Sequence, residues 1–61
     1  MAWVAVDKDG SECMHKGIPV RSKYDVWIDT YWEGYIELPK GTIKKLIGRE
    51  LTWSDEPVEL N

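Results

Sequence analysis

The hydrophobic pattern near the N-terminus alternates with a period of two residues. In segment 2–7 valines alternate with other residues, which is typical of a half-buried strand. Asp9-Gly10 follows, and this dipeptide favours a type I′ turn because both residues tolerate a positive φ. We therefore expect strands at residues 2–7 and 11–15 that pair antiparallel as a hairpin.

Three further extended segments follow this hairpin. Segment 18–21 contains Pro19, whose missing N–H assigns it to the edge of a sheet. Segment 25–31 alternates strictly, and segment 35–38 does the same after a turn at Gly34, which predicts a second antiparallel hairpin. The residues expected to face the core are Val26, Ile28, Ile36 and Leu38.

The period then changes to that of a helix. Apolar residues at i, i+3 and i+4 predict a short helix over residues 42–47 that docks on the sheet: Ile43, Leu46 and Ile47. Gly41 or Thr42 is the expected N-cap, and Gly48 stands where a glycine commonly ends a helix. Two turns are too short to be stable without such docking.

These elements define the fold class. Leu51 and Trp53 predict a last short strand or extended segment. The expected fold is α+β and mainly β, a small curled antiparallel sheet of two hairpins plus a C-terminal strand, with one short helix, similar to an SH3-like or related partial barrel. With 61 residues the chain forms at most one domain, residues 1–61.

The composition indicates the cellular compartment and shows an excess of Trp and Tyr over Phe. Cys13 is the only cysteine, so no internal disulfide is available, and the N-terminal apolar run is too short for a signal peptide. We expect a cytoplasmic protein without a membrane span. The chain has four Trp and three Tyr but no Phe, and these two residue types suit half-buried contact surfaces as well as cores.

The candidate metal and catalytic motifs are all incomplete. Cys13 and His15 share a strand face, but no other Cys or His exists to complete a zinc site or a Cys-His catalytic arrangement. The acidic segment 7–12 lacks the bidentate Glu of a calcium loop. We expect no metal, no cofactor and no enzymatic activity, with Cys13 buried and His15 facing solvent.

The outward face of the second hairpin is the main candidate site. If the hairpin buries its apolar side, the opposite side gathers aromatic and acidic residues: Trp27, Tyr31, Tyr35, Asp29 and Glu37. Such a face suits a basic protein partner or self-association. The alternative is that both faces of this sheet are covered, by the helix and by the N-terminal hairpin.

A basic segment gives a second candidate function. Residues 40–49 contain four basic residues and no acidic residue: Lys40, Lys44, Lys45 and Arg49. With nearby aromatic rings they describe a nucleic-acid-binding surface. The net charge of −3 opposes long-range attraction to phosphate, so we rank a nucleic-acid-binding domain behind a protein-interaction module.

The chain also resembles a group of short bacterial proteins carried by prophages and other mobile elements, a group without a known activity. The resemblance rests on four motifs: Asp7-x-Asp9-Gly10-x-Glu12, the run 38–43, the run 46–49 and the run 51–60. It implies a phage-type accessory role and no particular site residue.

Overall fold

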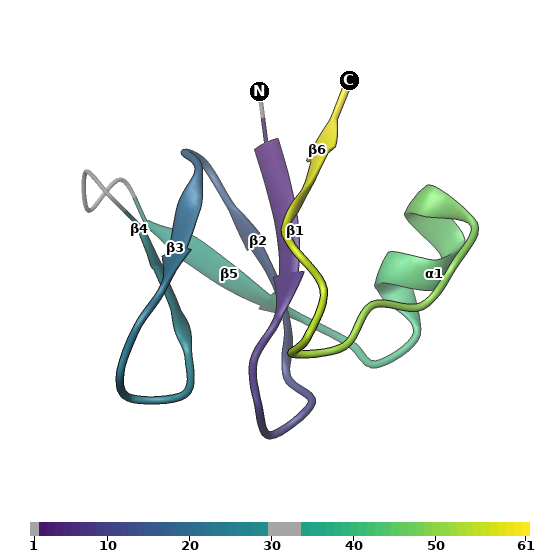
Figure 1. The fold of residues 1–61 in the computed structure, drawn as a ribbon. Coiled ribbons are helices and arrows are strands. Elements are labelled where there is room, and N and C mark those ends of the chain that lie inside the picture. Colours follow the sequence, from purple (N-terminus) through teal and green to yellow (C-terminus); the bar gives the residue numbers. More distant parts are fainter. Residues whose placement is uncertain (1, 30–33) are drawn as a thin grey trace.

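The computed structural model describes residues 2–29 and 34–61 (Figure 1). The elements in chain order are β1 (Ala2–Val6), β2 (Glu12–His15), β3 (Pro19–Arg21), β4 (Trp27–Asp29), β5 (Tyr35–Leu38), α1 (Thr42–Ile47) and β6 (Val58–Leu60). One antiparallel sheet has the strand order β5-β2-β1-β6, and a second contains β3 and β4. This confirms the α+β, mainly β class. The two sheets do not close into an SH3-like barrel.

The first hairpin forms as expected, but its turn is of another type. β1 pairs with β2 in antiparallel register, with Val4 opposite Met14. Gly10 has a positive φ of 91°, whereas Asp9 does not, so the loop is not a type I′ turn. The Gly10 N–H donates to the Asp7 carbonyl at 2.9 Å, and the Asp7 N–H donates to the Ser11 carbonyl at 2.9 Å.

The predicted second hairpin is wrong. β4 pairs with β3, and β5 pairs with β2, so the strands beginning at Trp27 and Tyr35 lie in different sheets. The chain turns instead between β3 and β4, where Asp25 adopts a positive φ of 64° and the Ser22 hydroxyl donates to the Val26 carbonyl at 2.7 Å. Local alternation identified the strands but not their partners.

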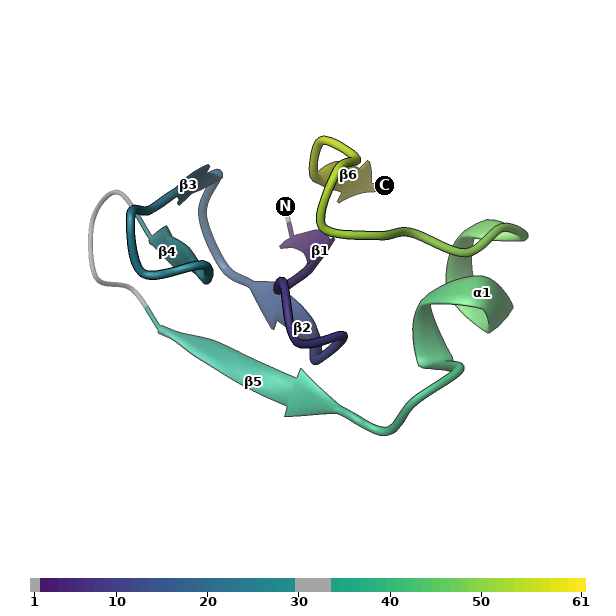
Figure 2. The same ribbon diagram turned by 60° about the horizontal axis from the view of Figure 1, so that its bottom comes forward.

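The four-stranded sheet is covered on both faces. On the helix-side face, Val4 and Val6 of β1 form the core with Ile43 and Leu51. Residues of opposite parity make up the hairpin-side face, where β1 and β2 bury Ala5, Cys13 and His15. Figure 2 shows α1 on one side of β1 and β2 and the β3–β4 sheet on the other.

The helix is held at its start by a residue from the sheet. Gly41 is the N-cap and has no side chain to offer, so its own N–H and that of Ile43 are satisfied by Glu12 of β2. The two donor–acceptor distances are 2.7 and 2.9 Å. Gly48 ends the helix in the left-handed conformation, as expected.

The helix docks through fewer residues than its pattern predicted. Ile43 is 1% exposed and Ile47 packs against the core, whereas Leu46 is 49% exposed. The expected burial of Leu46 is therefore wrong. The short helix contacts the core along one edge of its apolar face, so Ile43 and Ile47 pack there while Leu46 remains at the surface.

The C-terminal strand lies later than predicted. Leu51 is buried in the core, but neither it nor Trp53 is in a strand, and β6 pairs with β1 at Val58–Leu60 instead. Across the described ranges 2–29 and 34–61, no helix has the length and apolar character to span a bilayer.

Replacing Ile43 should destabilise the fold far more than replacing Leu46. We expect Ile43→Ala to lower the free energy of unfolding by about 2–5 kcal/mol, and Ile43→Val by about 0.5–1.5 kcal/mol, because each leaves a cavity in the core. The control Leu46→Ala should change it by less than about 1 kcal/mol. Urea unfolding measures all three, and a larger effect of Leu46→Ala would contradict the helix orientation.

Removing the carboxylate of Glu12 should loosen the start of α1. We expect Glu12→Ala to lower the free energy of unfolding by about 1–2 kcal/mol, since two helix N–H groups lose their acceptor. Faster hydrogen exchange at Gly41 and Ile43 should accompany it. Glu37→Gln, on the neighbouring strand, is the matched control, and equal exchange in both variants would contradict the capping role.

Candidate functional site

Trp27 is a core residue rather than an outward anchor. Its indole N–H donates to the Val6 carbonyl at 2.9 Å, and its backbone N–H donates to the Asp7 carboxylate at 2.8 Å. The ring is buried. The expected outward orientation of Trp27 is wrong, because β4 lies over the large sheet and turns this face inward.

Asp29 is also buried, in a hydrogen bond with His15. The His15 imidazole donates from Nδ1 to Asp29 Oδ1 over 2.6 Å, and both side chains are almost completely inaccessible to solvent. Neither His15 Nε2 nor Asp29 Oδ2 has a hydrogen-bond partner among the residues that the structure describes. The sequence placed Asp29 on an exposed face and His15 in solvent, and both placements are wrong.

Two members of the predicted face remain at the surface. Tyr35 is 62% exposed, and its ring stacks on the His15 ring at a centroid distance of 5.4 Å. Glu37, two residues further along β5, is exposed. Tyr31, which the sequence added to this face, lies outside the described residues. The structure thus brings Trp27, Asp29 and Tyr35 near one another across the two sheets, not along one face of a hairpin.

A hollow of about 330 Å³ lies where the two sheets meet. Its lining includes two carboxylate residues, two aromatic residues and two aliphatic residues from three separate segments: Asp7, Asp29, Trp27, Tyr35, Val26 and Ile28. We call it the inter-sheet hollow. It is acidic and aromatic, which is the chemistry that the sequence predicted for a different surface.

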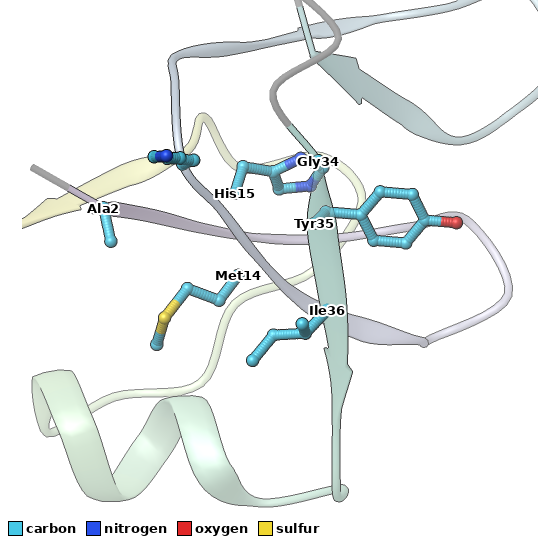
Figure 3. A pocket seen from close by; sticks show the side chains of 7 residues that line it. Ala2, Met14, His15, Gly34, Tyr35 and Ile36 are labelled. Carbon is cyan, nitrogen blue, oxygen red and sulfur yellow. The ribbon is translucent and has the colours of Figure 1, made fainter.

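An apolar groove of about 400 Å³ lies on the other side of β5. Figure 3 shows Met14 and Ile36 pointing to the helix side of the sheet, while the rings of His15 and Tyr35 lie on the opposite side. Ala2 completes the apolar part of the lining. Ile36 is 59% exposed, so the expectation that it faces the core is wrong. We call this feature the Met14–Ile36 groove.

Arg21 joins the small sheet to the C-terminal segment. Its guanidinium lies 4.5 Å from the ring centroid of Trp27 and 4.9 Å from that of Trp53, and it donates to the Trp53 carbonyl at 2.8 Å. Its remaining ion pair, with Glu56 at 3.6 Å, is exposed. This arrangement occupies Trp53 and Arg21 in the fold and leaves neither free to bind a partner.

The basic segment is only partly available for phosphate binding. The Lys40 ammonium lies close to Gly10, and the pKa of Asp9 is lowered first by hydrogen bonds from Ser11 and further by the charge of Lys40. Lys44, Lys45 and Arg49 are exposed, as expected of a solvated helix end. All four predicted cations are therefore exposed, and the nearby Asp9 offsets part of the positive charge of Lys40.

Cys13 is buried, as expected, and its environment opposes reactivity. Burial, and after it the negative charges of Asp7 and Glu37, together raise the pKa of the thiol to about 11. The thiol donates to the Asp7 carboxylate across 3.9 Å. Within residues 2–29 and 34–61, no three His, Cys, Asp or Glu side chains are grouped to hold a metal ion.

The sequence missed three residues of this region. Asp7 was assigned to the end of a strand, His15 to solvent and Ile36 to the core. They lie at the inter-sheet hollow, between the sheets and at the groove, respectively. The chemical signal of the site is the pair of buried atoms without hydrogen-bond partners among the described residues, His15 Nε2 and Asp29 Oδ2. That signal is visible only once the two sheets are packed together, so the sequence could not show it.

The folded protein should keep Cys13 protonated at neutral pH. The unfolded thiol ionises near its usual 9.0 and the folded thiol only near 11, so the unfolded state holds fewer protons between these values. The free energy of unfolding should therefore fall by up to about 2–3 kcal/mol from pH 9 to 11. Cys13→Ala should lack this component in urea titrations, and identical pH profiles would contradict the raised pKa.

Comparison with known proteins adds no family to this picture. Searches against protein families, curated proteins and solved structures found no match. The resemblance to prophage-type proteins therefore stays an expectation from the sequence. The function has to be argued from the geometry of β5, the Met14–Ile36 groove and the inter-sheet hollow.

Proposed function

We propose that the protein is a small non-enzymatic interaction module that binds an extended strand of a partner protein along β5. The observation that carries the proposal is that β5 is an edge strand with two large exposed side chains, Tyr35 and Ile36. An edge strand presents unpaired backbone N–H and C=O groups that another chain can use as a template. Strand addition of this kind is a common mode of peptide recognition.

The edge of β5 is less protected than the edges formed by β6 and β3. Proteins guard sheet edges with charges, prolines, bulges or very short strands. Glu37 is the only charge between Tyr35 and Leu38, and Pro39 lies beyond the strand. By contrast β6 has three residues and β3 begins with a proline. The edges formed by β6 and β3 therefore carry features that oppose strand pairing, whereas the edge of β5 has one charge and no proline within the strand.

The Met14–Ile36 groove gives an added strand a place for its side chains. Side chains of an added strand alternate between the two faces of the sheet, so every second one points to the helix side. There it meets Met14 and Ile36 across the groove. Backbone pairing then supplies affinity, and the groove selects apolar side chains.

Features outside the β5 edge make an enzyme or a nucleic-acid-binding domain a weaker proposal. The raised pKa of Cys13 and the burial of His15 oppose a thiol nucleophile. Lys40 lies beside the acidic turn at Asp9, which weakens the attraction of the basic segment for phosphate. A cytoplasmic location, supported by the single reduced Cys13, and an accessory role on a mobile element, supported by the resemblance alone, belong to this proposal.

Selection from a displayed library of random twelve-residue peptides tests the proposal. Selected peptides should shift the amide resonances of Tyr35–Leu38 and protect them from hydrogen exchange. Ile36→Lys should weaken their binding at least ten-fold, because it places a charge in the groove. Val20→Lys, at another exposed aliphatic site, on β3, is the matched control and should bind normally.

Two outcomes would contradict strand binding at β5. In one, the selected peptides shift α1 and are insensitive to Ile36→Lys. In the other, no peptide is selected, while mixed DNA or RNA binds with an affinity that falls steeply with salt and depends on Lys44, Lys45 and Arg49. That second result would establish the nucleic-acid alternative.

A further inference from the structure

We propose that the inter-sheet hollow is a receptor site for the guanidinium group of an arginine in the bound strand, an inference that rests on the proposed function for its partner. The hollow, of about 330 Å³, lies at the junction of the two sheets. Its position beside Tyr35 puts it next to the β5 edge, on the face opposite the Met14–Ile36 groove. One bound strand could therefore reach both.

The free oxygen of Asp29 is the first argument for a cationic ligand. Asp29 Oδ1 accepts from His15, but Asp29 Oδ2 is buried and has no donor within the described part of the chain. A buried acceptor without a partner costs about 1–3 kcal/mol, so native structures rarely leave one unused. Asp29 is among the residues that line the hollow, and in our proposal the ligand that enters there uncovers this oxygen and supplies the missing N–H donor.

The balance of charge around the hollow is the second argument. Asp7 adds another carboxylate to the lining, and no Lys or Arg is among the described residues that form it. Two cations close to lining residues already have acidic partners: Lys8 pairs with Asp25 at 3.8 Å, and Arg21, which lies over the Trp27 ring, pairs with Glu56 at 3.6 Å. The hollow thus favours a positive ligand.

The aromatic lining selects a guanidinium over an ammonium. Trp27 forms one wall, and the Tyr35 ring stands at the opening with most of its surface exposed. A guanidinium is planar and weakly hydrated, so it enters an aromatic site at a smaller desolvation cost than a lysine ammonium. Arg21 already lies over two tryptophan rings in this fold.

The geometry of β5 then defines the partner's sequence chemistry. Gly34 and Tyr35 border both the groove and the inter-sheet hollow, so the two sites are separated by the thickness of one strand. Successive side chains of an added strand point to opposite faces. The recognised segment is therefore extended, with an arginine directly next to an apolar residue in sequence.

Two small molecules of the same shape test the site without any peptide. Ethylguanidinium and its neutral isostere N-ethylurea are titrated separately into the ¹⁵N-labelled protein at equal concentrations and constant ionic strength. We expect ethylguanidinium to shift the resonances of Asp29, Gly34 and the Trp27 indole with saturation, and N-ethylurea to bind at least ten-fold more weakly. Equal binding of both molecules, or no saturable shift, would overturn the proposal.

Variants at the site and away from it separate local binding from general charge attraction. Asp29→Asn and Tyr35→Ser should each weaken ethylguanidinium binding, Asp29→Asn by at least ten-fold. Glu59→Gln removes one negative charge on the opposite edge of the sheet and should change binding less than two-fold. An equal loss in Glu59→Gln would overturn the proposal, and if Asp29→Asn does not fold, the comparison of the two molecules on the unaltered protein decides it.

Failure here and failure of strand binding are distinguishable. If selected peptides bind at β5 but ethylguanidinium does not bind, the hollow is not an arginine site and the interaction module stands. If ethylguanidinium binds with the expected dependence on Asp29 but no peptide is captured, the cation site stands and strand addition is wrong.

Discussion

The rest of the structure depends on the way in which Trp27 holds the small sheet against the large one. Its indole N–H reaches the Val6 carbonyl at the end of β1, and its amide reaches the side chain of the next residue, Asp7. Two hydrogen bonds from one residue therefore fix both the position and the direction of β4. Because β4 is fixed in this way, the hairpin-side face is covered by a separate two-stranded sheet, and β5 stays at an uncovered edge.

This anchor also explains much of the aromatic content of the chain. Arg21 lies over both Trp27 and Trp53, which meet edge to face with ring centroids 5.5 Å apart. The cluster ties the β3–β4 sheet to the irregular segment after α1, with which that sheet has no strand pairing in the described part of the chain. A domain of this size buries little surface on folding. Cation–π and aromatic pairs contribute stabilisation beyond that of the area they bury, so this cluster makes the small domain more rigid.

The sequence predicted those parts of the fold that depend on neighbouring residues. Asp9-Gly10 indicated the first hairpin, and Gly41 and Gly48 bounded the helix, because turns and helix ends are determined by local backbone conformation. Strand pairing is not local: the alternation from 25 to 31 is equally compatible with pairing to β3 or to β5. The deciding feature is the turn at Ser22–Asp25, where a serine hydroxyl and a non-glycine residue with positive φ replace the glycine that usually reveals a hairpin.

The candidate site was predicted in its chemistry but not in its geometry. An acidic and aromatic surface was expected, and Trp27, Asp29 and Tyr35 do come together with acidic neighbours. They do so because two sheets meet, not because one strand presents a face. The pairing of His15 with Asp29 could not be read from the sequence, since it joins residues of different sheets and depends on how those sheets pack.

Two features of this molecule are not explained by folding alone, and both border Tyr35. Short or charged edges keep a sheet from pairing with other chains, yet β5 presents exposed Tyr35 and Ile36 along an open edge. A buried pair is stabilised when all its polar atoms are bonded, yet Asp29 Oδ2 and His15 Nε2 lack partners among the described residues. Sequences depart from such rules mainly at functional sites, where a ligand completes what the fold leaves unsatisfied. That both departures meet at one end of β5 argues for a single binding event that satisfies them together.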